Sequence, residues 1–275
     1  MKTYIITVFL FVTTGLVAQL KIPSLSPSAS LSQNIGLSTV EVHYARPSKK
    51  GRKIFGNLLP YGELWRAGAN TATKFSFSKA ALLNGKRFEK GDYSILVIPN
   101  QNSWVINWYV YSSSNWNAYV EKTPIATFKI PVKHLEESIE TLSIGFKNNT
   151  LNSADLVIGW DMLEVIIPIK VVEKQEIIAS IEKTLSGPTN SDYFQAALYY
   201  HETNTDLNKA LMYIQNVTAS DKALFFQVTR EALILKDLNR NKDAVKAAKR
   251  ALLLSKKAKN KDFIKINKNL IKLLG

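Results

Sequence analysis

Cysteine is absent from this chain of 275 residues. Its absence excludes a disulfide framework, a thiol nucleophile, a cysteine-ligated metal and a lipid-modified cysteine near the N-terminus. Histidine is nearly as scarce: His43, His134 and His201 stand at no recognisable metal-binding spacing, so we expect no metal site and no cofactor. The chain also lacks a nucleophile elbow, a phosphate-binding glycine loop and a paired-carboxylate signature. These absences disfavour the familiar enzyme classes without deciding whether the protein is an enzyme, and they identify no catalytic residue.

Long apolar runs are also missing. The first run, from Tyr4 to Val17, follows Lys2 and precedes Ala18. It is too short to cross a bilayer of about 30 Å, which takes about 20 helical residues, but it matches the core of a secretory signal peptide. We therefore expect a signal peptide over residues 1–18 and export to the periplasm or the cell exterior. The apolar run at 165–172 predicts a strand, so the mature protein is not expected to span a membrane.

Acidic residues are too few to balance the basic ones. The chain has 22 Asp and Glu against 36 Lys and Arg, a net charge of +14, and residues 240–275 hold twelve of the basic residues but only two acidic ones. Such a run is usually a solvated helix face. The alternative is attraction to an anionic partner such as a membrane surface, an acidic polymer or an acidic protein. Nucleic acid is a disfavoured partner for an exported chain.

Alternation of apolar and polar residues dominates the first part of the chain. It recurs at 40–44, 75–77, 93–97, 104–110, 128–132, 142–146, 156–160 and 165–169. These segments predict strands, and Asn84-Gly85 between them predicts a hairpin turn because both residues tolerate positive φ. Because no helical pattern intervenes, we expect a β-sandwich or jelly-roll-like domain over residues 20–172, with the segment 21–32 as an extended lead-in and Trp104, Trp108 and Trp160 in the core.

From residue 173 the spacing of apolar residues becomes helical. Helices are predicted over 173–186, 192–202, 207–216, 222–238, 242–257 and 262–274. An offset of 34 residues pairs Ala210 with Ala244, Leu198 with Ala232, Ile214 with Ala248 and Asp206 with Arg240. The all-α region 173–275 is therefore similar to a tetratricopeptide repeat array over about residues 192–255, followed by a capping helix. We expect this array to pack on the helix 173–186 or on the β domain. This resemblance implies a protein partner; the alternative is a helical bundle that only covers the sandwich.

The stretch from residue 42 to residue 73 combines arginines, aromatic residues, glycines and prolines in a way that neither a plain strand nor an amphipathic helix requires. Its characteristic residues are Tyr44, Arg46-Pro47, Lys50-Gly51-Arg52, Ile54-Phe55-Gly56, Pro60-Tyr61-Gly62, Trp65-Arg66, Gly68-Ala69-Asn70 and Thr73. With Gly85, Gly91, Tyr93-Ser94, Pro99 and Trp104, these residues resemble the family called domain of unknown function 2911, over most of residues 26–171. The resemblance implies no established activity, substrate or catalytic residue.

The side chains of this stretch suggest a binding site. Arg46, Arg52 and Arg66 each carry a planar fork of donors suited to a carboxylate or phosphate. Further candidates are Tyr61 and Trp65, which offer flat aromatic faces, and the polar residues Asn70 and Thr73. We therefore predict a pocket for a small anionic or carbohydrate-like ligand.

Three other interpretations remain at this point. In the first, the stretch is an irregular loop whose arginines bond to main-chain carbonyls, Glu41 and Glu63. In the second, the protein is a hydrolase in which His43 and Glu63 act as base and acid beside the arginines and Asn70. In the third, the protein is a structural scaffold of the cell envelope.

Overall fold

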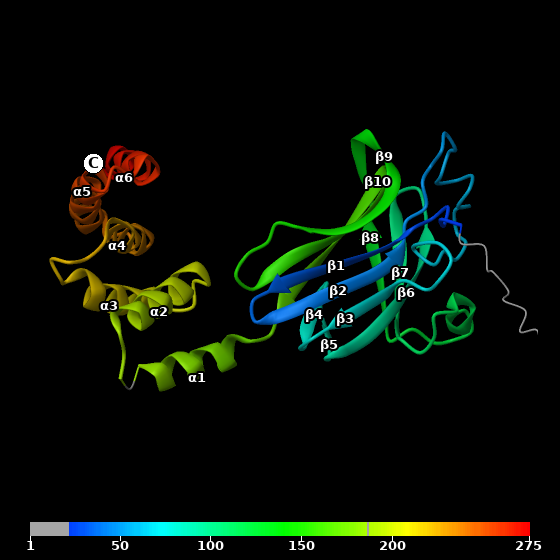
Figure 1. The fold of residues 1–275 in the computed structure, drawn as a ribbon, viewed down its shortest axis with the longest axis horizontal. Helices are drawn as coiled ribbons and strands as arrows, with labels where there is room; N and C mark the ends of the chain where they lie inside the picture. Colours follow the sequence, from blue (N-terminus) through cyan, green and yellow to red (C-terminus); the bar gives the residue numbers. More distant parts are fainter. Residues whose placement is uncertain (1–21, 186) are drawn as a thin grey trace, which may run out of the picture.

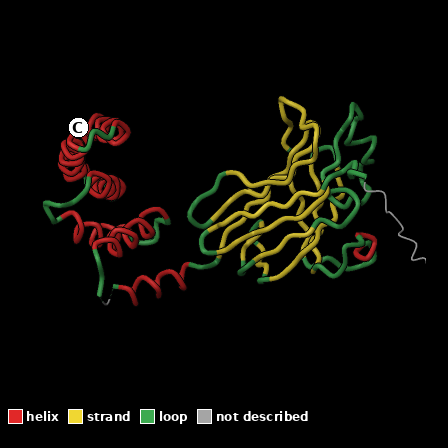
Figure 2. Tube along the Cα trace, in the orientation of Figure 1, coloured by secondary structure: helices red, strands yellow, loops and turns green. Residues whose placement is uncertain are grey.

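The computed structural model describes residues 22–185 and 187–275, so the expected signal peptide lies outside the described residues. An antiparallel β part, residues 28–171, is followed by six helices within residues 174–274 (Figures 1 and 2). The predicted fold class, an all-β part followed by an all-α part, is therefore confirmed. None of the described helices is long and apolar enough to cross a membrane.

Two antiparallel sheets form the β part. The first has the order β1 (Ser28–Ile35), β2 (Ser38–Ala45), β3 (Lys74–Phe77), β6 (Gly91–Pro99), β7 (Ser103–Val110) and β8 (Ala126–Pro131). The second has the order β5 (Lys86–Phe88), β4 (Ala81–Leu83), β10 (Ser153–Val171) and β9 (Lys133–Lys147). The apolar residues that face each other between the two sheets belong to one buried cluster. Trp104, Trp108 and Trp160 lie within it, as predicted.

Most predicted strands are present, with two differences. The segment expected to be a lead-in contains β1, which pairs with β2 along its whole length. The strands predicted at 156–160 and 165–169 are two parts of β10, and the register against β9 shifts around Asp161, which has φ +53°. The predicted turn at Asn84-Gly85 is confirmed: it joins β4 to β5 with φ of +45° and +81°.

The helices are α1 (Lys174–Thr184), α2 (Asn190–Glu202), α3 (Leu207–Thr218), α4 (Phe225–Asp237), α5 (Asn241–Lys257) and α6 (Lys261–Leu274). Helix α2 packs against α3, and α4 packs against α5. Helix α6 also packs against α5. Buried alanines such as Ala210, Ala232 and Ala244 allow the helix axes to approach closely. The helices share a second apolar cluster, separate from that of the sandwich. Ile178 and Ile181 of α1, and Leu185 directly after it, pack against this cluster, as expected.

Helix α1 also joins the helices to the sandwich (Figure 1). Glu173, just before it, is buried and accepts hydrogen bonds from the Leu37 N–H at 2.7 Å and the Ser38 hydroxyl at 2.5 Å. Both donors lie at the turn between β1 and β2. One turn into the helix, Glu176 forms an exposed ion pair with Lys79 at 2.8 Å. The start of the helical part is therefore bonded to the edge of the first sheet.

Candidate functional site

The segment between β2 and β3, residues 46–73, connects the two sheets at one end of the sandwich. Near its start, the Lys49 N–H donates to the Glu140 carbonyl of β9 at 2.7 Å. Farther along, Trp65 and Val97 of β6 exchange two hydrogen bonds of 2.7 Å. Between these points Ile54 and Phe55 are buried in the sandwich core. The segment has no regular secondary structure, but both of its ends are fixed by main-chain hydrogen bonds.

A hollow of about 420 Å³ lies along this segment. Its lining residues come from the chain just before β1, from the segment itself and from β10: Leu25, Ser26, Pro47, Ser48, Lys50, Arg52, Leu58, Leu59, Trp65, Arg66, Gly68, Ala69 and Trp160. Three of these residues are cationic, and no carboxylate is present among the described residues that line the hollow. The hollow therefore combines positive charge with a partly apolar wall.

Arg52 and Arg66 are the two predicted arginines that line the hollow. Arg52 is held by its own loop: its Nε donates to the Lys49 carbonyl at 2.9 Å and a terminal nitrogen donates to the Ser48 carbonyl at 2.7 Å. The guanidinium of Arg66 lies 5.0 Å from the ring centroid of Trp116. A guanidinium has five N–H donors, so both groups keep donors for a ligand.

The other predicted site residues are placed differently. Trp65 lines the hollow, and its indole N–H donates to the Gly68 carbonyl at 3.2 Å. Thr73 is fully buried and donates to the Ala67 carbonyl at 2.9 Å, so its side chain stabilises the turn between residues 67 and 73. The Asn70 amide donates to the Ser26 carbonyl at 3.3 Å and is engaged with the N-terminal segment.

Arg46 and Tyr61 do not line the hollow. The Nε of Arg46 donates to the Leu142 carbonyl of β9 at 3.0 Å, which is the bonding expected of a structural loop arginine. Tyr61 is exposed, and its ring packs so closely on Gly56 that a Cβ at that glycine would lie 2.6 Å from it. Of the three predicted arginines, Arg52 and Arg66 therefore line the hollow, whereas Arg46 bonds to β9.

Sequence reasoning missed three contributors. Lys50 lies beside Arg52 at the hollow, and its neighbour Gly51 was the signal for a sharp turn there. Trp160 was assigned to the core, where it is 2% exposed, yet it also forms part of the wall. Trp116, which contacts Arg66, begins a short 3₁₀ helix far along the chain, and nothing in the sequence placed it near the segment.

Asp161 fixes the segment from β10. Its carboxylate accepts from the Lys49 ammonium at 2.5 Å, the Ser138 hydroxyl at 3.1 Å and, more weakly, the Ile54 N–H at 3.4 Å. Burial on its own raises the pKa of Asp161, but the hydrogen bonds from Lys49, Ile54 and Ser138 outweigh burial and lower the pKa from its usual value. The carboxylate is therefore ionised and holds the first part of the segment against the second sheet.

The residues of the hydrolase interpretation do not converge. His43 lies on the exposed face of β2, where its Nδ1 is 2.7 Å from the Ser30 hydroxyl and its Nε2 is 3.8 Å from Glu41. Glu63 is exposed and does not line the hollow. Among the residues that the structure describes, no group of three His, Asp or Glu side chains could hold a metal. Among the described residues that line the hollow there is no histidine or carboxylate that could form an acid–base pair.

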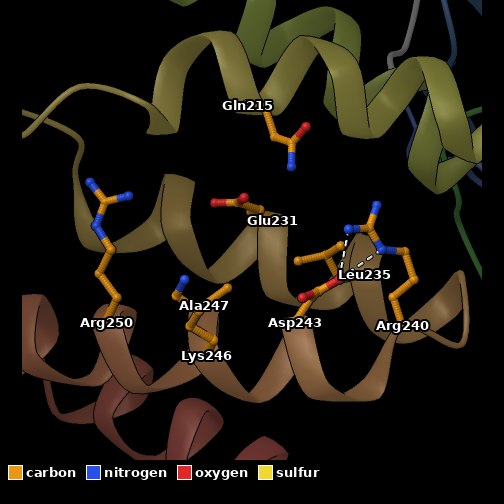
Figure 3. A pocket seen from close by; sticks show the side chains of 8 residues that line it. All are labelled: Gln215, Glu231, Leu235, Arg240, Asp243, Lys246, Ala247 and Arg250. Atoms are coloured by element: carbon orange, nitrogen blue, oxygen red, sulfur yellow. Dashed lines mark hydrogen bonds and ion pairs between the residues drawn. The ribbon is translucent and has the colours of Figure 1, made fainter.

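A second hollow, of about 290 Å³, lies between α3, α4 and α5 (Figure 3). Its charges are largely satisfied: Arg240 pairs with Asp243 at 2.6 Å, and Arg250 donates to the Thr218 and Ser220 carbonyls at 2.6 and 2.9 Å. The side chain of Gln215 points into the gap from α3. This groove is a weaker candidate, because both of its arginines are already bonded, Arg240 to Asp243 and Arg250 to main-chain carbonyls, and its lining contains charges of both signs.

Comparison with known proteins gives one result. No curated protein and no solved structure matches the chain significantly. A family model described as "Protein of unknown function (DUF2911)" matches residues 26–169, which contain nearly all of both sheets and every residue that lines the hollow except Leu25. The match covers more than half of the chain, and the chain therefore belongs to the DUF2911 family.

Proposed function

We propose that the β domain binds a small organic anion in the hollow beside residues 46–73. The observation that carries the proposal is the lining by Lys50, Arg52 and Arg66, without a carboxylate among the described lining residues. Uncompensated positive charge in a concave site raises the local concentration of anions. The forks of the two arginines match the geometry of a carboxylate or a phosphate.

The apolar part of the wall narrows the ligand class. Leu25, Leu58 and Leu59 line the hollow together with the two tryptophans. The volume falls within the range of about 300–1,000 Å³ that is typical of small-molecule sites. Trp65 and Trp160 are 5% and 2% exposed, so neither offers the open face on which a sugar ring stacks. These features favour a carboxylate or phosphate attached to an apolar body over a carbohydrate.

A thermal-shift comparison tests the proposal, with benzoate and inorganic phosphate as probes and glucose as the neutral control. A ligand present at about 100 times its Kd adds about 2.7 kcal/mol to the free energy of unfolding. We expect benzoate to raise the melting temperature more than phosphate and glucose to leave it unchanged. Arg52→Ala and Arg66→Ala should each weaken binding about tenfold or more, because each removes a charged donor worth about 1.5–3 kcal/mol.

Two matched arginine variants serve as controls. Arg46→Ala removes an arginine that bonds to Leu142 outside the hollow, and Arg87→Ala removes an exposed one that pairs with Glu89. Both should bind the probe as the wild type does, apart from any change in the unliganded melting temperature. Equal loss of binding in Arg46→Ala and Arg66→Ala, or a shift with glucose alone, would contradict the proposal.

We further infer that the helices form a tetratricopeptide-like array that presents a surface to a protein partner in the periplasm or outside the cell. Two successive antiparallel pairs, α2 with α3 and α4 with α5, support the repeat assignment. So do the fully buried alanines Ala210 and Ala244, which are 34 residues apart. Cell fractionation of a tagged full-length chain tests the export on which this inference depends.

A further inference from the structure

The outer face of α6 carries a continuous row of lysines. Lys261, Lys265, Lys268 and Lys272 are spaced by four, three and four residues, and all four are exposed. With 3.6 residues per turn, this spacing places them in one narrow stripe along the helix. The opposite face of α6 packs into the helical cluster through Leu270 and Ile271. The helix is thus apolar towards the protein and cationic towards solvent.

Helix α5 repeats this arrangement. Lys242, Lys246, Lys249 and Lys256 are exposed and follow one side of the helix at spacings of four, three and seven residues. Lys257 and Lys259 continue the basic surface to the start of α6. Helices α5 and α6 pack together at the end of the molecule away from the sandwich (Figure 1).

The charge of these helices is not compensated locally. Residues 240–275 carry ten lysines and two arginines against Asp243 and Asp262, and Asp243 is bonded to Arg240. Within the part of the chain that the structure describes, none of the ten lysines forms an ion pair. Surfaces of soluble domains more often intersperse charges of both signs. The unpaired positive surface is therefore suited to a polyanionic partner.

Exposed apolar side chains beside the lysines indicate which polyanion. Leu253 lies within the lysine row of α5 and is 69% exposed. On α6, Ile266 and Leu273 lie seven residues apart, each about 100° around the helix from the lysine before it, and are 41% and 73% exposed. A dissolved acidic polymer offers no apolar region in which these side chains could be buried. The interface of a bilayer takes both, since lysines bind anionic headgroups while leucines enter the acyl boundary.

We propose that the α5–α6 face is a peripheral docking surface for an anionic lipid bilayer. Lysines attract the headgroups as point charges, and no pocket is needed because the partner is a surface. Leu253 and Leu273 insert after the electrostatic approach. Docking leaves the hollow of the β domain free, because most of its lining residues belong to the segment 46–73. This segment lies at the end of the β part away from the helices (Figure 1).

Vesicle co-sedimentation of the full-length protein tests this proposal. We expect binding to phosphatidylcholine vesicles that contain about one quarter phosphatidylglycerol, and none to pure phosphatidylcholine. Binding should fall steeply as salt is raised from about 0.1 M to about 1 M, because the Debye length shrinks from about 10 Å to about 3 Å. The triple variant Lys265→Glu, Lys268→Glu, Lys272→Glu should lose at least about tenfold in partition coefficient.

A matched triple variant separates the local surface from net charge. Lys90→Glu, Lys129→Glu and Lys170→Glu make the same charge change on exposed positions of the β domain and should keep most of the binding. Leu253→Asn with Leu273→Asn should weaken vesicle binding several-fold but leave binding to heparin unchanged.

Three results would overturn the proposal. The first is absence of wild-type binding to the anionic vesicles. The second is equal loss of binding in the two triple variants, which would assign attraction to net charge. The third is full vesicle binding by the leucine variant together with tight heparin binding, which would identify an acidic polymer as the partner. Helical circular dichroism of each variant verifies that it is folded; if the glutamate variant is not, the corresponding Lys→Gln triple replaces it.

Discussion

Asp161 shows at the residue scale how one side chain can organise a site that it does not line. It lies at the irregularity of β10, in a left-handed conformation that Asp tolerates better than most residues. Before it, Leu156, Ile158 and Trp160 face the core at even positions; after it, Leu163, Val165, Ile167 and Ile169 do so at odd positions. The bulge therefore changes which alternate residues of β10 face the core. It also directs the carboxylate of Asp161 to Lys49 and Ile54.

The lowered pKa of Asp161 predicts a pH effect on stability. A carboxylate whose folded pKa is lowered stabilises the fold above its unfolded pKa of about 3.9, and this contribution is lost as the pH falls through the folded pKa. Asp161→Asn should reduce the free energy of unfolding by about 1–3 kcal/mol at pH 7. The difference from wild type should shrink below about pH 4, as measured by urea unfolding at each pH.

Asp221→Asn is the control for Asp161→Asn, because Asp221 is exposed and forms no hydrogen bond through its side chain among the described residues. It should change stability little at any pH. A difference between Asp161→Asn and wild type that stayed constant from neutral to acidic pH would contradict the role given to the ionised carboxylate.

The arginines show where reasoning from sequence ends at this scale. Their number and the glycines around them predicted a cationic site, and Arg52 and Arg66 do lie at one hollow. Arg46 does not, because it directly follows β2 and its side chain reaches the neighbouring sheet at Leu142. That difference depends on a contact between the two sheets that joins residues 96 positions apart, and no local pattern of residues indicates it. Trp116, whose ring contacts the guanidinium of Arg66, was missed for the same reason.

At the scale of elements, local periodicity predicted the helices and most strands because these patterns depend on neighbouring residues alone. The helix positions require one change to the offset of the proposed repeat. A uniform offset of 34 pairs Leu198 with Ala232, but Leu198 is only half-buried, whereas Ala197 is fully buried. The turn between α2 and α3 is one residue longer than that between α4 and α5. The first helices of the two pairs therefore correspond at an offset of 35, and the second helices at 34.

The close approach of the helices predicts a size limit at Ala244, which is fully buried. Ala244→Leu should reduce the free energy of unfolding of the helical part by about 1–3 kcal/mol, because a well-packed core cannot take extra methylenes without shifts. Urea unfolding followed by circular dichroism at the helical band measures this change.

Ala258→Leu makes the same substitution at an exposed position at the end of α5 and should change stability by less than about 0.5 kcal/mol. If Ala244→Leu cost no more than this control, the helices would not pack through small residues at that point, and the tetratricopeptide-like assignment would lose its main support.

For the whole molecule, the joint between sandwich and helices is a small polar contact. Glu173 receives the Leu37 N–H and the Ser38 hydroxyl, and Gly36 beside them has φ +60°. A Cβ at Gly36 would lie 2.5 Å from the Glu173 carboxylate, so the turn has no space for a side chain. No local pattern of residues indicates this joint, because it forms between residues 136 positions apart.

Loss of the Glu173 carboxylate should loosen the joint. Glu173→Ala leaves two donors unpaired and should lower the free energy of unfolding by about 1–3 kcal/mol. Small-angle scattering should show a broader distribution of interatomic distances, because α1 loses its fixed direction from the sandwich. Glu176→Ala, which removes only the exposed pair with Lys79, should alter neither measurement appreciably. Superimposable scattering profiles for Glu173→Ala and wild type would refute this function of the joint.

The attachment of residues 46–73 to both sheets has a consequence for how the hollow is occupied. The part of the wall formed by residues 46–73 cannot move away unless main-chain hydrogen bonds to β9 and β6 break, so this part is held in place before a ligand binds. Binding then requires little additional ordering of this part of the receptor, which favours affinity.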